Sequence, residues 1–467
     1  MNRERETWGS RIGFVLAAAG SAVGLGNIWR FPYITGENGG GAFLLIYIFF
    51  TFVVGVSIMT AEFILGRNSK LSSVGAFKSK NRSWTFVGAL SVLAPFLIMG
   101  YYPVIGGWSL AYTVKSLTGL LASPDIEGTF VNLITGTWEP LIWMLIYLSF
   151  NVFIILRGVT KGIEKASVIL MPTLFVLLLI IIVKGLTLPG ASEGLKFLLK
   201  PDFSQVRPSS FLVALGQAFF SLSLAMGVMT TYASYLGKEE SLPQNALIIS
   251  TMDFTVALMA GLALFPALFA FGMEPSQGPG LVFMVVPKIF AAMGGVGPIF
   301  SFIFFAALMV AALTSSMSLL EVVVSYLMDE RGMERRKATL LSAGAMSVVC
   351  IFASLSQGPM ANFTIFGVGT LDFLDLVTDK IFLAVGGLFI SIFVGWKLDK
   401  EMLFNEFTNH GKSAVGIFPL WYNLIKYVIP VMVTAVAVSG ILSIKQTGVM
   451  LTGVAIIALL AIFSKKL

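Results

Sequence analysis

The first apolar segment of the chain contains Ala17-Ala-Ala-Gly-Ser-Ala-Val-Gly-Leu-Gly-Asn-Ile-Trp-Arg30-Phe-Pro32. It is apolar enough for a membrane, yet its glycines and its proline make it a poor continuous helix, because each glycine costs about 1 kcal/mol relative to alanine. A helix interrupted inside a bilayer frees backbone carbonyls and amides, which are tolerated only where they line a cavity or bind a solute. The segment therefore predicts a binding site for ions and a small polar molecule.

Composition assigns the chain to the membrane proteins. Of its 467 residues, 57% are hydrophobic and 12% are charged, whereas about a quarter of the residues in a soluble domain are charged. Repeated apolar runs of about twenty residues are long enough for helices to cross a bilayer. We therefore expect an all-α membrane protein with multiple spanning helices.

Charge and rare residue types exclude several other classes. A net charge of +7 would suggest nucleic acid for a soluble protein, but in a membrane protein it reflects the Lys and Arg of cytoplasmic loops. The only cysteine, Cys350, excludes intrachain disulfides, and the only histidine, His410, lies in a polar stretch that argues against a metal site. The sequence contains no P-loop motif for ATP. It also lacks a His/Cys cluster or a nucleophile–base pair in the spans, which argues against an enzyme.

We expect twelve membrane spans; the last is short, so eleven is the alternative. They lie near residues 12–35, 41–66, 86–120, 138–156, 164–186, 209–235, 245–272, 298–327, 338–354, 374–396, 424–442 and 448–463. Lys and Arg cluster before the first span, between the second and third, after the fourth and after the eighth. The loops near 121–137 and 355–363 contain none, although 187–208 contains three. This bias predicts a multi-pass protein of the plasma (inner) membrane with a cytoplasmic N-terminus and no cleaved signal peptide.

A second interrupted span comes five spans after the first and contains Gly216-Gln-Ala-Phe-Phe-Ser-Leu-Ser-Leu-Ala-Met-Gly227. Broken spans at matching positions of two five-span halves indicate an inverted repeat, with the binding site between the halves. We therefore expect a first repeat at 1–186, a second at 187–396 and two C-terminal helices at 397–467. Close helix packing through small residues is the alternative explanation for many of the glycines.

Four motifs resemble the neurotransmitter:sodium symporter family, which includes bacterial leucine, tyrosine and multi-hydrophobic amino-acid transporters. They are Gly24-Leu-Gly-Asn-Ile-Trp-Arg-Phe-Pro32, Glu37-Asn-Gly-Gly-Gly-Ala-Phe43, Thr231-Tyr-Ala-Ser-Tyr235 and Ala312-Leu-Thr-Ser-Ser316. The resemblance covers nearly the whole chain. It implies about twelve helices in a 5+5 inverted repeat with helices one and six broken. It also implies alternating access, two bound sodium ions and no organic cofactor.

The resemblance implies two sodium sites, to which an unwound helix supplies carbonyl oxygens without extra charge. The first uses the carbonyl of Ala22 and the side chains of Asn27, Ser221 and Asp253, completed by the substrate carboxylate. The second uses the carbonyls of Gly20, Val23 and Ala311 with the hydroxyls of Thr314 and Ser315. Without the first broken span beside them, these two hydroxyls are better explained by bonds back to their own helix.

Asp253 is an acid within a span, which costs about 2.5–3.5 kcal/mol on insertion scales and indicates a functional role. Chloride-dependent relatives have a neutral residue near this position and use the anion to balance sodium. An aspartate here would supply the negative charge itself, so we expect transport without chloride. A structural, hydrogen-bonded aspartate is the alternative.

The polarity of broken helices matches a zwitterionic amino acid, since half-helix N-terminal ends attract a carboxylate and C-terminal ends suit an ammonium. The resemblance assigns the carboxylate to Leu25, Gly26 and the Tyr102 hydroxyl, and the amine to Ala22, Phe220 and Ser223. Its side-chain pocket consists of Ser21, Gly24, Ile98, Phe220, Met226, Ser315 and Leu319, and Ser221 completes the candidate substrate-binding set. The pocket is apolar, which favours hydrophobic and aromatic amino acids over charged ones.

Charges on both sides of the site predict two gates. On the extracellular side, we expect Arg30 to pair with Asp375, with Gln217 nearby, above an aromatic lid of Phe220 and Tyr102. On the cytoplasmic side, the candidate residues are Arg5, Trp8, Tyr235 and Asp329.

Four other features depart from a simple helix bundle. We expect Glu62 to accept amides freed by the broken sixth span, whereas the partner of Glu321 is left open. Gly162 and Pro172 resemble the family's site of local unwinding. Ala225 stands where relatives usually have glycine.

These features predict a sodium symporter whose partners are a small-molecule substrate, namely a neutral hydrophobic or aromatic amino acid, and membrane lipid, with no nucleic acid. Protein partners and oligomeric state are left open. The alternatives are an ion channel, because broken helices also line selectivity filters, and a transporter of another small zwitterion.

Overall fold

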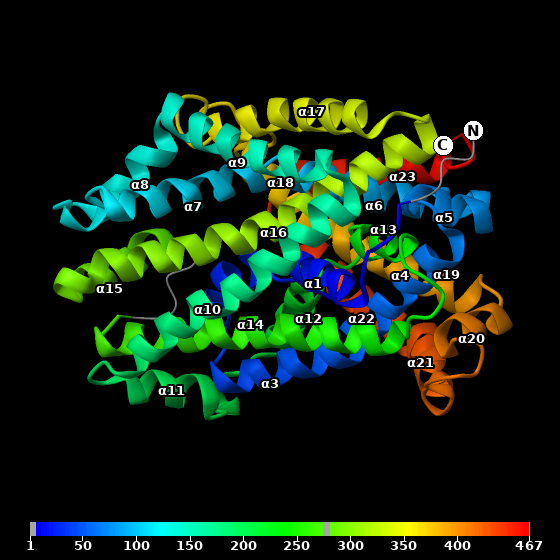
Figure 1. The fold of residues 1–467 in the computed structure, drawn as a ribbon, viewed down its shortest axis with the longest axis horizontal. Coiled ribbons are helices and arrows are strands. Elements are labelled where there is room, and N and C mark those ends of the chain that lie inside the picture. The colour runs from blue at the N-terminus through cyan, green and yellow to red at the C-terminus, as the bar shows by residue number, and fades with distance from the viewer. Residues whose placement is uncertain (1–5, 274–280, 467) are drawn as a thin grey trace.

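The computed structural model describes residues 6–273 and 281–466. Within these ranges the regular structure is helical, apart from isolated bridges of Gly40 with Pro201 and of Ile365 with Val368. The helices run side by side along the long axis of the molecule (Figure 1), so that most of them cross it from end to end. This arrangement confirms the all-α class predicted from composition.

Nine helical stretches in the described ranges are long and apolar enough to cross a membrane. They are Gly41–Ser69 (containing α3 and α4), Arg82–Leu117 (containing α6 and α7), Trp138–Leu156 (α9), Val159–Leu186 (containing α10, Lys165–Leu186), Leu242–Ala270 (α14), Gly294–Arg331 (containing α16, Gly297–Arg331), Arg335–Leu355 (α17), Thr370–Trp396 (containing α18 and α19) and Val415–Ser443 (containing α21 and α22). The bent pair Arg11–Ala22 (α1) and Gly26–Glu37 adds a tenth, with a 47° angle at its break. The broken pair α12 (Pro208–Ser221) and α13 (Val228–Ser234) and the short α23 (Thr447–Ile462) complete a set consistent with twelve.

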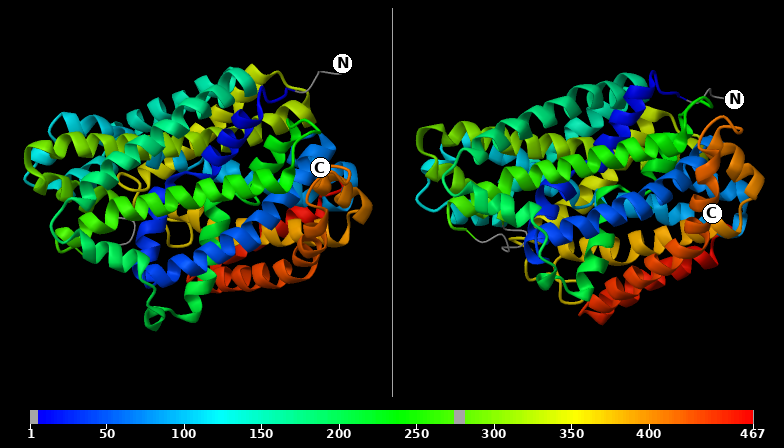
Figure 2. Two further views of the ribbon diagram at one scale, coloured as in Figure 1. Left: turned by 60° about the horizontal axis from the view of Figure 1, so that its bottom comes forward. Right: turned by 90° about the horizontal axis from the view of Figure 1, so that it is seen from below.

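Shorter helices cover the two ends of the bundle. α8 (Ile126–Thr135), α11 (Ala191–Leu199) and α15 (Val286–Ala292) lie at the left-hand end in Figure 1, and α5 (Ser73–Lys80) and α20 (Lys400–Thr408) lie at the other. The chain enters α1 from the right-hand end and leaves α23 there too (Figure 2). The first and last helices therefore have their free ends at the same end of the bundle, as expected for an even number of spans.

Both breaks lie where the sequence predicted them. α1 ends at Ala22, and after Val23–Leu25 the chain continues as a π-helical turn, Gly26–Arg30, into α2 (Phe31–Glu37). In the sixth span, α12 ends at Ser221 and α13 begins at Val228. Between them Ser223 and Ala225 have φ of 51° and 61°, and Gly227 has 67°. The left-handed region suits glycine but costs about 1–2 kcal/mol for other residues, so the second break contains local strain at Ser223 and Ala225.

The two broken helices occupy the middle of the bundle, where α1 packs against α10, α14 and α16 and α13 packs against α4 (Figures 1 and 2). Burial is therefore extensive around the first break: residues 13–28 are buried with the single exception of Leu16. Backbone groups that have left the helical pattern are thus surrounded by protein, as a membrane environment requires.

Candidate functional site

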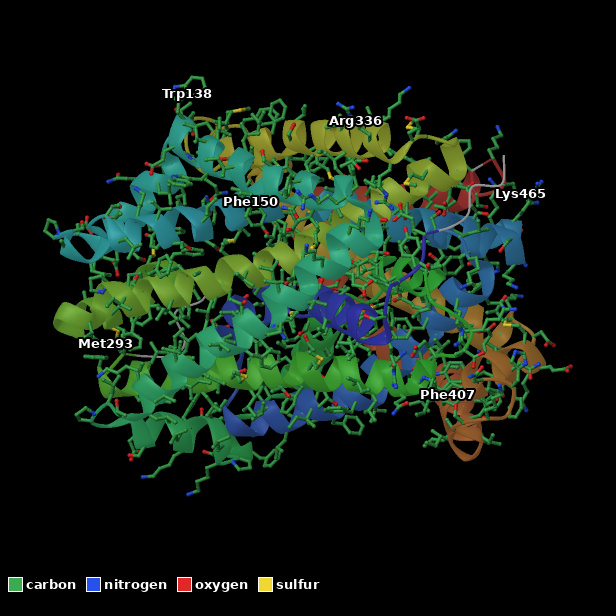
Figure 3. All side chains as sticks on the ribbon, viewed as in Figure 1. Trp138, Phe150, Met293, Arg336, Phe407 and Lys465 are labelled. Carbon is green, nitrogen blue, oxygen red and sulfur yellow. The ribbon has the colours of Figure 1, made fainter. Side chains whose placement is uncertain are left out.

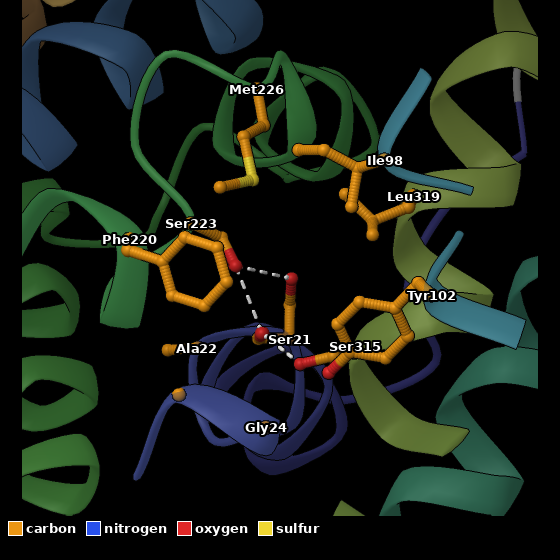
Figure 4. Close-up of a pocket in the computed structure, with 11 residues that line it drawn as sticks. Ser21, Ala22, Gly24, Ile98, Tyr102, Phe220, Ser223, Met226, Ser315 and Leu319 are labelled. Carbon is orange, nitrogen blue, oxygen red and sulfur yellow. Dashed lines mark hydrogen bonds between the residues drawn. The ribbon is translucent and has the colours of Figure 1, made fainter. Parts of the chain in front are cut away.

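A small cavity lies between the two breaks and the middle of α16 (Figure 4). Its lining residues are Ser21, Ala22, Gly24, Gly26, Ile98, Tyr102, Phe220, Ser223, Met226, Ser315 and Leu319. The structure thus brings together the whole predicted substrate-binding set except Leu25 and Ser221. These two residues are sequence neighbours of lining residues. The remaining space is about 20 Å³, roughly that of one water. An amino acid therefore needs the lining side chains to move apart.

The cavity has a polar and an apolar side. On the polar side, the hydroxyls of Ser223 and Ser315 donate to the Ser21 carbonyl at 2.9 and 2.6 Å. The Leu25 amide donates to the Tyr102 hydroxyl at 3.1 Å, which places a backbone donor and a phenol at the first break. Figure 4 shows Met226, Ile98 and Leu319 on the opposite side. One side of the cavity therefore suits the polar groups of a ligand, and the opposite side suits an apolar part of the same ligand.

Two glycines of the first break make close approach possible. A Cβ at Gly24 would lie 2.8 Å from the Tyr102 hydroxyl oxygen, and one at Gly26 would lie 3.0 Å from the Phe220 ring. Both distances are too short for a real Cβ without movement of the neighbour. Glycine at both positions therefore lets Tyr102 and Phe220 lie this close to the unwound backbone.

The predicted first sodium site is a buried cluster of hydrogen-bonded oxygens. The Asn27 amide nitrogen donates to Asp253 Oδ1 at 2.8 Å, and the Ser221 hydroxyl donates to the same oxygen at 2.8 Å. Asn27 and Asp253 are both fully buried. Tyr47, which the sequence reasoning missed, donates its hydroxyl to Asp253 Oδ2 at 3.2 Å. Tyr47 lies on α3, whose sequence is almost entirely apolar. Such a sequence does not indicate that its one tyrosine points into a polar cluster.

The predicted second site lies where α16 meets the first break. The Thr314 hydroxyl oxygen is 3.0 Å from the Ala311 carbonyl oxygen and 3.4 Å from that of Val23. A Cβ on Gly20 would lie 3.2 Å from Thr314 Cβ, so this residue is adjacent. The Ser315 hydroxyl instead donates to the Ser21 carbonyl at 2.6 Å. The structure thus groups four of the five predicted residues and directs the fifth toward the cavity.

The second break is held by the buried carboxylate of Glu62, as the sequence predicted. Its Oε1 accepts the Ala225 amide at 2.7 Å, and its Oε2 is 3.4 Å from the Thr230 hydroxyl oxygen. Glu62 is fully buried on α4 (Val56–Ser69). An acid here replaces a helical hydrogen bond that the unwound backbone no longer makes.

The charge pair that we expected on the extracellular side has a different acidic partner. Arg30 binds Asp379 through two hydrogen bonds of 2.8 and 2.9 Å, and not Asp375. Asp375 accepts the Tyr101 hydroxyl at 3.1 Å. The two acids are four residues apart, so they share a helix face, and sequence spacing does not choose between them. Gln217 lies near the first break, where its amide donates to the Gly26 carbonyl at 2.9 Å.

Arg30 also connects the charge pair to the aromatic lid. Its guanidinium lies 4.6 Å from the centre of the Phe220 ring, which lines the cavity. The arginine thus contacts a residue of the cavity wall without lining the cavity itself.

On the opposite side, Trp8 and Tyr235 lie together as predicted. The Trp8 indole donates to the Tyr232 carbonyl at 2.9 Å, and its ring lies 6.2 Å from that of Tyr235. Asp329 accepts the Ser72 amide at 2.6 Å. Arg5 lies outside the described residues. The predicted unwinding site is also irregular, because Gly162 lies in a π-helical turn, Val159–Glu164, before α10 (Lys165–Leu186), which contains Pro172.

Glu321, whose partner the sequence left open, belongs to an ion-pair network. Arg335 donates to both of its oxygens at 2.7 and 3.0 Å, and the Tyr235 hydroxyl donates at 2.8 Å. Arg335 also binds Glu6 at 3.0 Å. From sequence alone, the basic residues 335–337 indicate only the topology of the spans. Nothing in the sequence distinguishes the one of the three that points inward.

A chain in which two broken helices meet over a central cavity has the architecture of a secondary transporter. A model described as the sodium:neurotransmitter symporter family matches residues 5–133 and 131–451. The chain belongs to this family of sodium-coupled transporters, and it is not an enzyme.

Individual relatives agree with this assignment. An uncharacterised sodium-dependent transporter, YhdH of Bacillus subtilis, is 40% identical over 93% of this chain and 98% of its own length. The sodium-dependent serotonin transporter of Drosophila melanogaster is 28% identical over 95% of this chain and 78% of its own. The crystal structure of MhsT in complex with L-phenylalanine is 42% identical, with a TM-score of 0.86 over 94% of this chain and all of that one.

Proposed function

We infer that this protein is a symporter that moves two sodium ions inward with one neutral, hydrophobic or aromatic amino acid, by alternating access and without chloride. The observation that carries this proposal is the cavity between the two breaks, with hydroxyl and amide groups on one side and Met226, Ile98 and Leu319 on the other. The L-phenylalanine bound to the similar MhsT supports the same substrate class. We also propose that the protein lies in the plasma membrane with a cytoplasmic N-terminus; the charge bias of the loops supports that orientation.

The backbone of the amino acid would bind at the polar side of the cavity. The Leu25 and Gly26 amides and the Tyr102 hydroxyl would hold the carboxylate, and the oxygens near Ala22 and Ser223 would accept from the ammonium. None of the described residues that line the cavity is charged, so an acidic or basic substrate would be desolvated without a partner, which is costly. Met226 can repack around different shapes because its side chain is flexible and polarisable.

Sodium would bind at the two oxygen clusters. Carbonyl, hydroxyl and carboxylate oxygens are the ligands that hard cations prefer, and both clusters are built from them. At the first cluster, sodium would compete with the amide hydrogens that Asn27 now donates to Asp253. Sodium binding would therefore rearrange Asn27 at the first break, and that rearrangement would couple the ion to the substrate next to it.

The coupling is tested by equilibrium binding of a radiolabelled hydrophobic amino acid to the purified protein in sodium and in potassium. We expect tight binding only in sodium, and equal affinity in the two salts would refute symport. Competition in the same assay tests the substrate class. Leucine, methionine, phenylalanine and tyrosine should displace the label, whereas displacement by glutamate or lysine alone would overturn the pocket assignment.

Chloride independence is tested by replacing chloride with gluconate during uptake into proteoliposomes. Because the buried Asp253 carboxylate would balance the sodium charge, wild-type uptake should not change. Asp253→Ser should make uptake depend on chloride. A wild type that requires chloride would contradict this role of Asp253 while leaving sodium coupling intact.

A further inference from the structure

A groove of about 380 Å³ runs along the outer surface of the bundle between α9 and α17. These helices pack against each other and lie together along the upper edge in Figure 1. Among the residues that line the groove are Phe153, Leu156, Leu340, Ala343, Gly344 and Ser347. It is separate from the substrate cavity, since the two share no lining residue.

The walls of the groove suit a hydrocarbon chain. Phe153 and Leu340 are 56% and 51% exposed, so they face the surroundings of the protein. The Ser347 hydroxyl donates to the Gly344 carbonyl at 2.8 Å, and Ser149 donates in the same way to Leu145 at 2.7 Å. Both hydroxyl hydrogens are thus used in hydrogen bonds within their own helices. A polar solute would therefore find few hydrogen-bond donors on this surface.

One end of the groove is basic. Arg157 directly follows α9, and its guanidinium lies 4.0 Å from the centre of the Phe153 ring. Arg336 lies one turn before Leu340 on α17, so the two share a helix face, and it extends outward from α17 in Figure 3. Within 6–273 and 281–466, neither arginine has an acidic partner. Arg335 next to it points inward to Glu321 and Glu6.

We propose that this groove binds an anionic glycerophospholipid, with an acyl chain along Phe153 and Leu340 and the phosphate between Arg157 and Arg336. The charge decides the class of ligand, because two uncompensated guanidiniums beside an apolar channel match a group with a negative head and a hydrocarbon tail. A second copy of the chain fits less well. In a dimer with its two-fold axis along the membrane normal, the basic ends of the two grooves would lie at the same depth in the membrane. The arginines of both copies would then approach and repel each other.

The test is native mass spectrometry of the purified full-length protein with equal amounts of phosphatidylglycerol and phosphatidylcholine. The wild type should retain phosphatidylglycerol preferentially. The double variant Arg157→Gln/Arg336→Gln should lose that preference by about fivefold or more for each arginine. Arg331→Gln is the matched control, because it removes one exposed positive charge at the end of α16 (Gly297–Arg331), which does not line the groove, and it should retain the preference.

A second variant tests the apolar part of the site. A Cβ at Gly344 would meet nothing within 4 Å, so Gly344→Leu should fill the groove without disturbing the packing of α17. We expect it to reduce lipid retention with both arginines present. Equal retention of the two lipids by the wild type, or unchanged retention in both variants, would overturn the proposal. A dimer that the variants abolish while lipid retention stays constant would assign the groove to a second copy and also overturn it.

Discussion

Replacing Asp379 by asparagine should open the outer side of the substrate cavity. Asp379 and Arg30 are only 8% and 16% exposed at the side chain, and they share two charge-assisted hydrogen bonds. Each such bond contributes about 1.5–3 kcal/mol, and a neutral one about 1 kcal/mol. Asparagine keeps one acceptor, so the closed arrangement should lose about 2–5 kcal/mol. That corresponds to a shift of about 30- to 4,000-fold toward the open form.

The shift is measurable as thiol accessibility. Cys350 is the only cysteine and is buried, so a Cys350→Ser background leaves one reporter, Ile98→Cys, in the cavity wall. Ile98 is 1% exposed, and a membrane-impermeant reagent added outside should label it slowly. Asp379→Asn should raise the labelling rate at least tenfold.

Asp375→Asn is the matched control for this experiment. It removes the charge one turn away but keeps an acceptor for the Tyr101 hydroxyl, so labelling should stay near the background rate. The reverse pattern, with fast labelling in Asp375→Asn and slow labelling in Asp379→Asn, would refute the assignment of Asp379 as the partner of Arg30.

Three stability measurements test the other buried groups. Arg335→Gln leaves the fully buried Glu321 without its counter-charge and should lower the free energy of unfolding by about 3–5 kcal/mol. Adding Glu321→Gln should restore most of the Tm. A single variant as stable as the wild type would contradict the ion pair. Glu62→Ala leaves the Ala225 amide without its acceptor and should cost about 1–3 kcal/mol, whereas Glu62→Gln should lose much less. Ala225→Gly removes a methyl from a residue at φ 61° and should raise the free energy of unfolding by about 1 kcal/mol; an unchanged or lower Tm would argue against strain at this position.

Local properties of the chain are sufficient to predict the membrane class and the two breaks. Glycine, proline and polar residues act on the backbone within a few positions, so the interruption after Ala22 and the one between Ser221 and Val228 follow from nearby residues. The resemblance of the motifs to a known family then names a cavity set, most of which the structure brings together. The number of spans is likewise local, because it depends on apolar length and on the positions of Lys and Arg.

Long-range pairing is what only the tertiary structure decides. Asp375 and Asp379 have the same residue type and the same helix face, and the choice between them depends on where α1 and its continuation place Arg30, which is 349 residues from Asp379 in sequence. The same holds for Arg335, which turns inward to Glu321 while Arg336 stays outside. A sequence specifies the charge of each residue, but which charges meet depends on the packing of helices whose contacts are set by the whole bundle.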